Sequence, residues 1–519
     1  MKKCEDTGYQ AVRWNEPLIF ELGKKGRRGF DVPRSSEELK ESVGDIKSDI
    51  PESIRRKDPP GLPELTEPEV LRHFIRLSQQ TYGTDSGINA GVGTCTMKYN
   101  PKINEKLARA AKLAHLHPDQ EEETVQGILE IMYRLKQWLC VISGLDEFSL
   151  QPRGGAHAVF ANATIMKAYL QARGELEQRN EIITTVLSHP CNASSPGVAG
   201  MKILSLYPDE ETGIPSVEAL KEAVSDKTVG MMITDPYDTG VFDDNITEYI
   251  DIVHDAGGLV AIDQANANCI LGKLRIGDTG ADLCHFNLHK SFSTPHGSCG
   301  PGSAPIGARE ELAEFLPTPL VEFDGERYYL ERDRPKSIGQ IGSYYGVVPN
   351  AIRAYTWIMT TGAEGMEEVS EIAVLNSNYL ARKLIKIKGI DLPWFDSHPL
   401  RMQEGRFTVE KMKEDTGIGI ADVNRRIVDF GIQRCFTSHE PWIVPEPFTP
   451  EPTESVSKED LDRFAEIFQR VSDEAYNNPE IVKDAPHCCS ISKVDLGPAT
   501  DSEKWATTWR AYIKKRERD

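Results

Sequence analysis

The sequence predicts an α/β protein with a mainly parallel sheet flanked by helices, followed by a smaller α+β domain. Two observations lead to this prediction. Six short apolar runs between residues 181 and 308 alternate with stretches of helical periodicity, as buried parallel strands and their crossover helices do. Beyond about residue 345 the alternation ends, and a long helical stretch is followed by mixed segments. We therefore expect a large sheet domain and a second core.

The length of the chain also argues for more than one domain, because 519 residues are many for a single core. Residues 1–70 are rich in Pro, Arg, Lys and Glu and have too few apolar positions to form a core. We expect an extended N-terminal arm at 1–75, a large domain at 76–345, and a small C-terminal domain with a tail at 346–519.

Charge and composition exclude several classes of partner. The 60 Lys and Arg against 80 Asp and Glu give a formal net charge of −20. A field of this sign repels phosphate backbones and anionic lipids, so neither nucleic acid nor a membrane is an expected partner. No apolar leader and no run of about 18 apolar residues occurs. The ten cysteines lack metal-ligand spacing. We expect a cytoplasmic protein with reduced thiols and no metal site.

Periodicity places the individual elements. Helices are expected at 67–80, 103–116, 123–144, 216–224, 245–257 and 346–387. Buried strands are expected at 181–187, 202–207, 229–235, 258–263, 282–287 and 303–308. In open α/β sheets ligands bind beyond the carboxyl ends of the strands. The residues that follow each apolar run are therefore the candidates for a site.

Four of these places carry suggestive chemistry. The stretch "QPRGGAH" (151–157) puts glycines at a helix start, where free N–H groups favour a phosphate. His189 and Asp263 each follow a strand, and His289 and Lys290 follow another. Each alone has an ordinary explanation: a turn, a core histidine, a helix cap or a surface lysine. Together they are the groups that pyridoxal 5′-phosphate requires.

Each group has a chemical reason to be there. Lys290 can form a Schiff base with the cofactor aldehyde, and Asp263 can keep the pyridine nitrogen protonated, so that the ring accepts electrons. An imidazole at His189 can stack on the ring, and His289 can reach the phosphate. The glycines that follow Lys290 let the backbone approach a bound ligand closely.

Longer motifs point to a family. The chain resembles the glycine dehydrogenase (decarboxylating) family, the P-proteins of the glycine cleavage system, and within it the pyridoxal-phosphate subunit of the two-chain form, subunit 2. The motifs are "RWNEPLIFELGKKGRRG" (13–29), "TCTMKYNPKINEKL" (94–107), "EETVQGILE" (122–130), "FNLHKSFSTPHGSCGPGSAPIG" (286–307) and "EPTESVSKEDLDRF" (451–464). The resemblance extends from about residue 13 to about residue 495, nearly the whole chain.

The resemblance implies an aspartate-aminotransferase-like (fold type I) enzyme. In it Lys290 takes the Schiff-base position, Asp263 the pyridine-nitrogen position and His189 the ring-stacking position. The resemblance further assigns the phosphate side to Gly155, Ala156 and His157. It puts these residues on the substrate side: Cys95, Thr96, Lys98, Asn100 and His296.

The family reaction implied by this resemblance decarboxylates glycine and transfers the aminomethyl group to the lipoyl group of a carrier protein. The resemblance also implies a subunit 1 homologue as a partner. The assembly would be a homodimer or two copies of each of two chains.

Several positions depart from the family motifs: Arg153, Cys191, Asp235, Asp238 and Gln433. Because residues that line a pocket set substrate choice, an alternative stays open. It is a paralogous decarboxylase, aldolase or transaminase that uses the same cofactor on another small amino acid without lipoyl transfer. A non-catalytic scaffold is disfavoured, because both Lys290 and Asp263 are present.

Overall fold

The computed structural model describes residues 7–30, 33–45, 48–58, 60–81, 87–88, 90, 98–296 and 301–517. Cys95 and Thr96 lie outside these residues. The chain forms two compact units, one of Met1–Gly83 with Asp484–Asp519 and one of Thr84–Lys483. Among the described residues, no helix is both long and apolar enough to cross a membrane.

The first unit joins the two ends of the chain. Its helices are α1 (Ile19–Leu22), α2 (Glu37–Val43), α3 (Glu67–Gln79) and α17 (Trp509–Arg516). Phe20 stacks on Trp509 with ring centroids 5.1 Å apart, and the N–H of Ala11 donates to the carbonyl of Cys488 at 3.0 Å. The N-terminal segment therefore packs with the C-terminal tail. Cys488 is disulfide-bonded, which corrects the expectation of reduced thiols throughout.

The second unit is built on a sheet of seven strands in the order β1-β7-β6-β5-β4-β2-β3. Strands β2 to β6 run parallel, and β7 is antiparallel to its neighbours β1 and β6. The predicted, mainly parallel sheet is confirmed. The strands are β1 (Glu147–Ser149), β2 (Glu181–Thr185), β3 (Lys202–Leu206), β4 (Thr228–Thr234), β5 (Leu259–Gln264), β6 (Leu283–Phe286) and β7 (Ile306–Ala308).

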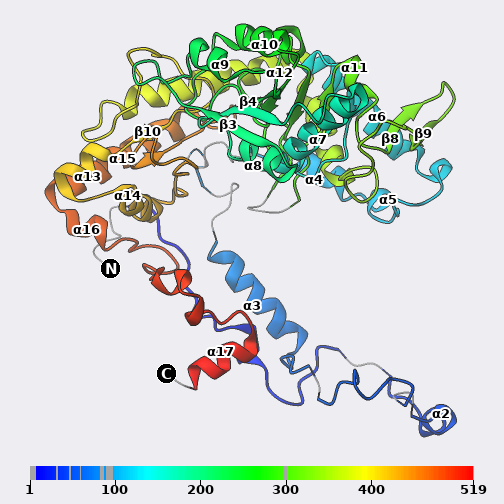
Figure 1. The fold of residues 1–519 in the computed structure, drawn as a ribbon. Coiled ribbons are helices and arrows are strands. Elements are labelled where there is room, and N and C mark those ends of the chain that lie inside the picture. The colour runs from blue at the N-terminus through cyan, green and yellow to red at the C-terminus, as the bar shows by residue number, and fades with distance from the viewer. Residues whose placement is uncertain are drawn as a thin grey trace. The chain divides into compact units, whose positions relative to one another are not determined.

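Helices cover both faces of this sheet (Figure 1). Side chains alternate along the strands, so that in β4 Met231 and Ile233 join one core while Met232, between them, joins the other. The first core is closed by α6 (Gln126–Ser143), α9 (Val217–Ala223) and α10 (Ile246–Asp255). The second is closed by α7 (Gly155–Arg173), α8 (Cys191–Val198) and α11 (Glu310–Ala313).

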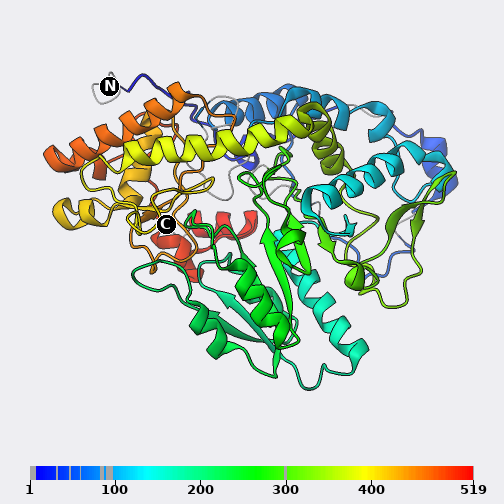
Figure 2. The same cartoon turned by 90° about the horizontal axis from the view of Figure 1, so that it is seen from above.

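A long helix, α12 (Val348–Leu384), runs across the unit beside α15 (Lys458–Asn477), as Figure 2 shows in yellow-green and orange. It breaks at Gly362, whose φ is 72°. Before the break Ala354 and Trp357 belong to the first sheet core, whereas Leu380 and Leu384 belong to a third core. One helix therefore serves two cores, and the boundary at residue 345 stays a prediction.

The third core is the small α+β part that the sequence predicts. Phe407 on β10 and Phe448 on β11 stack with centroids 5.3 Å apart over α15. The remaining elements of this unit are α4 (Lys102–Ala108), α5 (Ala111–Ala114), β8 (Leu320–Phe323), β9 (Tyr328–Glu331), β10 (Phe407–Thr408), α13 (Glu410–Thr416), α14 (Ile420–Ile427), β11 (Pro447–Phe448) and α16 (Pro479–Lys483). Sequence patterns missed the short strand β1 and the β8–β9 hairpin.

Candidate active site

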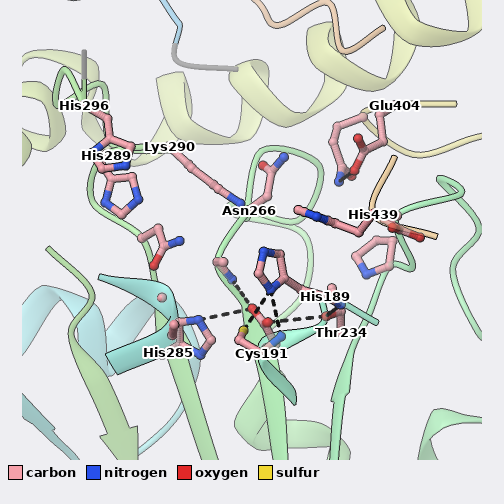
Figure 3. A pocket seen from close by; sticks show the side chains of 18 residues that line it. His189, Cys191, Thr234, Asn266, His285, His289, Lys290, His296, Glu404 and His439 are labelled. Atoms are coloured by element: carbon pink, nitrogen blue, oxygen red, sulfur yellow. Dashed lines mark hydrogen bonds and ion pairs between the residues drawn. The ribbon is translucent and has the colours of Figure 1, made fainter. Parts of the chain in front are cut away.

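A pocket lies at the carboxyl ends of the parallel strands (Figure 3). Asp263 comes from the end of β5, His189 from the segment after β2, and Lys290 from the turn after β6. The start of α7 contributes Gly155 and Ala156. Strand ends far apart in the sequence converge here because the strands are parallel and share one edge.

Asp263 is buried, and its carboxylate accepts several hydrogen bonds. Oδ2 accepts from Asn192 Nδ2 at 2.9 Å and from Thr234 Oγ1 at 3.3 Å, and Oδ1 accepts from the N–H of Ala265 at 2.9 Å. His285 Nε2 lies 3.2 Å from Oδ1. Burial by itself would raise the pKa of Asp263, but the neighbouring histidines and the donors hold it below its ordinary value. Asp263 therefore stays ionised.

His189 stands above this carboxylate as a neutral ring. Burial lowers its pKa to about 4, although the charge of Asp263 opposes the shift. Its Nδ1 accepts from the N–H of Cys191 at 3.1 Å and lies 2.9 Å from Cys191 Sγ. These contacts leave the proton on Nε2. The ring meets His439 edge-on, with centroids 4.6 Å apart.

Lys290 is buried, with only 8% of its surface exposed, which is unusual for a lysine. Its side chain points into the pocket in Figure 3. The His289 ring lies 4.3 Å from that of His296, and both line the pocket. Burial and the charge of Lys290 lower the pKa of His289 to about 3, so this ring is neutral as well.

The first turn of α7, where the sequence predicts the phosphate side, forms one wall of the pocket. A Cβ placed on Gly155 would lie 3.0 Å from Asn287 Nδ2, so a larger residue here would displace this amide. The free N–H groups of this 19-residue helix face the pocket where Gly155 and Ala156 line it. His157 is not part of the pocket lining; its Nδ1 accepts from the N–H of Arg153 at 3.3 Å.

Two predicted substrate-side residues lie outside the pocket lining. Lys98 Nζ is 2.9 Å from Glu454 Oε1 and 4.5 Å from the centre of the Trp357 ring. Asn100 donates to Glu105 Oε1 at 2.9 Å. Both make contacts with other residues of the unit, and their substrate-side role stays a prediction.

The positions that depart from the family motifs are not equivalent. Cys191 and Asp238 line the pocket, whereas Arg153, Asp235 and Gln433 do not. Asp238 forms an ion pair with the buried Arg406. Asp235 accepts from the N–H of Asp243 at 3.1 Å, and burial raises its pKa well above the ordinary value.

Sequence reasoning missed several pocket residues. Asn192 and His285 contact Asp263. Of these two, His285 could have been suspected from the sequence, because it is paired with Asp263 across β5 and β6. Gln403, Glu404 and His439 line the other side of the pocket but come from segments without a motif of their own. Only the fold brings these residues to the site.

The donor set fits pyridoxal 5′-phosphate. A buried ionised carboxylate, a neutral histidine, a buried lysine and a glycine-rich helix start surround one cavity. They match the pyridine nitrogen, the ring, the aldehyde and the phosphate of that cofactor. Within the described part of the chain, no cluster of three or more His, Cys, Asp or Glu side chains could hold a metal ion.

Two family models match this chain. The model described as glycine dehydrogenase, C-terminal domain, matches residues 369–487, and the model of class-V aminotransferases matches residues 153–299. The second match contains Asp263 and Lys290, and the first contains Glu404. The class-V match accords with a pyridoxal-phosphate fold.

Similar proteins extend over nearly the full length. The probable glycine dehydrogenase (decarboxylating) subunit 2 of Pyrococcus abyssi is 48% identical over 512 residues, which cover 98% of this chain and 99% of the relative. The protein of the same description from Caldanaerobacter subterraneus is 43% identical over 479 residues, 92% of this chain and 96% of the relative.

Solved structures agree in fold. A glycine decarboxylase (P-protein) of the glycine cleavage system, in inhibitor-bound form, superposes with a TM-score of 0.70 at 21% identity over 85% of this chain and all of that chain. The Escherichia coli cysteine desulfurase CsdA gives 0.57 at 16% identity over 77% of this chain and 98% of that chain. The predicted fold type I architecture is confirmed.

Proposed function

The chain belongs to the glycine dehydrogenase (decarboxylating) subunit 2 family, and from this premise we propose that it decarboxylates glycine with pyridoxal 5′-phosphate. One observation carries the proposal beyond the family resemblance. Asp263 is ionised at the base of the same pocket into which Lys290 points. A carboxylate and a lysine so placed suit the two reactive ends of the cofactor.

Each residue has a defined task in this proposal. When bound, the cofactor supplies an electron sink for the pair left on the glycine carbon as CO2 departs. Asp263 holds a proton on the pyridine nitrogen. His189, neutral and fixed through Nδ1 by the N–H of Cys191, covers the ring without adding charge. The N–H groups at the start of α7 bind the phosphate, with Gly155 allowing its close approach.

Lys290 would hold the cofactor through its aldehyde, next to the place where the substrate amino group would bind. Its burial excludes water from the reacting carbon, which favours loss of CO2 because a departing carboxylate is less stable when it is poorly solvated. His289 and His296 lie beside it as a ring pair. We assign these two rings to the wall of the pocket near the phosphate and the substrate.

Carboxyl-labelled glycine tests the function. The holoenzyme should release labelled CO2 from glycine, and the release should increase when a lipoyl carrier protein is added. Alanine and serine, tested in parallel, should give much less. If another small amino acid releases CO2 faster than glycine, and the carrier has no effect, the chain is the paralogous decarboxylase rather than a glycine cleavage subunit.

We extend the proposal to partners. The names of the relatives, which call them subunit 2, support a subunit 1 homologue as the natural partner of this chain. We propose an assembly of two copies of each chain that delivers the aminomethyl group to a lipoyl carrier. Light scattering and turnover, measured before and after addition of the subunit 1 homologue, test it. A homodimer whose turnover the homologue does not change would contradict it.

A further inference from the structure

A second carboxyl site occupies the side of the pocket away from Asp263. Glu404 lines this side and is 1% exposed, and Glu451 lies behind the lining and is fully buried. Figure 3 shows Glu404 on the same side as His439 and across the pocket from His285 and Cys191. A carboxyl group that is buried in a site of low dielectric with few hydrogen-bond donors cannot ionise cheaply.

From this geometry we propose that Glu404 retains a proton and delivers it to the sulfur that leaves when the lipoyl disulfide is opened. Glu404 is then a catalytic residue, because it lines the pocket and donates the proton. Glu451 is a positioning residue, because it acts through Glu404. The inference rests on the function proposed above.

The hydrogen bonds of the two side chains differ in a way that assigns these roles. Glu451 Oε1 accepts from Asn266 Nδ2 at 2.5 Å and from Asn268 Nδ2 at 3.1 Å, so this carboxyl is held in place. Glu404 Oε1 has only a long contact of 3.4 Å from Gln403 Nε2. The Oε2 atoms of Glu404 and Glu451 have no hydrogen-bond partner among the described residues. Glu404 is therefore the member that can exchange a proton with a ligand.

The backbone fixes Glu404 at this wall. A Cβ on Gly240 would lie 1.8 Å from the carbonyl oxygen of Glu404, so the two segments can touch only because residue 240 is a glycine with φ of 81°. Met402 N–H donates to the Gly240 carbonyl at 2.8 Å. The segment that carries Glu404 is thereby tied to the loop after β4, which carries Asp238.

The charges around the pair favour one retained proton. Burial and the charges of Glu451 and Asp238 raise the pKa of Glu404 well above its ordinary value, against Lys290 and Arg406. Burial raises the pKa of Glu451 to about 8, against the two asparagines, Lys290 and Lys98. Burial raises the pKa of Asp238 as well, even though its ion pair with Arg406 opposes the shift.

The proton balances the transfer step. The bond from the glycine carbon to its carboxylate breaks and leaves its electron pair on that carbon. This carbon bonds to one lipoyl sulfur, the sulfur–sulfur bond breaks, and the other sulfur leaves as a thiolate. The Glu404 proton converts the thiolate to a thiol, and Glu404 regains a proton from solvent when the carrier departs. The disulfide is reduced and the glycine carbon oxidised, so no other oxidant is needed.

Infrared spectroscopy of the holoenzyme tests the proton directly. The difference between wild type and Glu404→Gln at pH 7 should contain the C=O stretch of a protonated carboxyl that shifts in D2O. Glu451→Gln should change the pH at which this band fades. Asp235→Asn is the matched control, because it removes another buried protonated carboxyl but should leave the Glu404 band and the pH dependence of turnover unchanged. Absence of the Glu404 band would overturn the proposal.

Kinetics separates this proposal from the function itself. Glu404→Gln should lower aminomethyl transfer to the carrier about 100-fold, the scale of one general acid. Carrier-independent exchange of CO2 with the glycine carboxyl should fall much less than transfer does, because that step needs no proton from Glu404. Glu404→Asp should restore part of the transfer. An equal loss of transfer and exchange in Glu404→Gln would refute the assignment of Glu404. A wild-type enzyme that does not use glycine would refute the proposed function, and the infrared band would then decide whether Glu404 holds a proton.

Discussion

The two ends of the pocket hold buried carboxyl groups whose pKa values are shifted in opposite directions. Asp263 accepts three hydrogen bonds and has a lowered pKa. Glu404 accepts one long contact and has a raised pKa. Both are nearly inaccessible to solvent. Burial alone would raise the pKa of each. The histidines and hydrogen-bond donors around Asp263 reverse that effect, whereas the charges of Glu451 and Asp238 add to it at Glu404. One fold thereby offers an ionised carboxylate and a carboxylic acid a short distance along the same cavity.

Removal of the lysine between these ends should have the largest effect. Lys290→Ala should abolish turnover, and borohydride should no longer trap the cofactor on the protein, because the other pocket residues cannot form the covalent link. Peptide mapping of the trapped wild-type enzyme is the check. A modified peptide that carries a different lysine would show that the site has been assigned wrongly.

Removal of the Asp263 carboxylate should have the next largest effect. Asp263→Ala should bind cofactor and fold, yet turn over orders of magnitude more slowly, because an unprotonated pyridine is a weaker electron sink. Asp263→Glu should retain a little activity. The measurement is kcat together with cofactor absorbance and thermal unfolding. Near-normal kcat in the alanine variant would exclude Asp263 from the mechanism.

The donors to Asp263 should have an intermediate effect. Asn192→Ala removes one bond to Oδ2, so the pKa of Asp263 should rise and the acid limb of kcat/KM should move to higher pH. A hydrogen bond to a charge is worth about 1.5–3 kcal/mol, which corresponds to about one to two pH units. Thr228→Ser, a buried change outside the pocket, is the control and should leave the limb in place. An unmoved limb in Asn192→Ala would contradict the role of the donors.

The protonated end of the pocket should have a smaller effect, which is seen in the pH dependence of stability. The pKa of Glu451 is raised from 4.5 to about 8 in the folded protein, so the folded state holds a proton that the unfolded chain has lost. Stability should therefore fall as pH rises from about 4.5 toward 8. Glu451→Gln should flatten this slope in thermal unfolding. A slope of the same size in both proteins would show that Glu451 does not hold the proton.

The sequence predicts the ionised end far better than the protonated end. Asp263 lies at the end of β5 and Lys290 shortly after β6, and parallel strands bring their carboxyl ends to one edge. The strand pattern therefore marks these positions, and the residue types and the family motifs single them out. Glu404 sits near no predicted element, and its position depends on the contact between Gly240 and its own carbonyl. That contact joins segments more than 160 residues apart, and no local pattern encodes it.

Residue roles copied from a motif meet a similar limit. His157 and Lys98 stand in recognisable motifs, yet His157 contacts the backbone of Arg153 and Lys98 pairs with Glu454, away from the pocket lining. A motif fixes where a residue stands along the chain. The side-chain direction depends on tertiary packing, which the sequence pattern does not contain.

The protonation state of the cofactor nitrogen tests the central claim most directly. Holoenzyme prepared with pyridoxal 5′-phosphate labelled with 15N in its ring can be followed by NMR from pH 5 to pH 9. The ionised Asp263 predicts a protonated nitrogen across this range and a neutral one in Asp263→Asn. A neutral nitrogen in the wild-type enzyme at pH 7 would contradict the account, because the carboxylate would then not be paired with the cofactor.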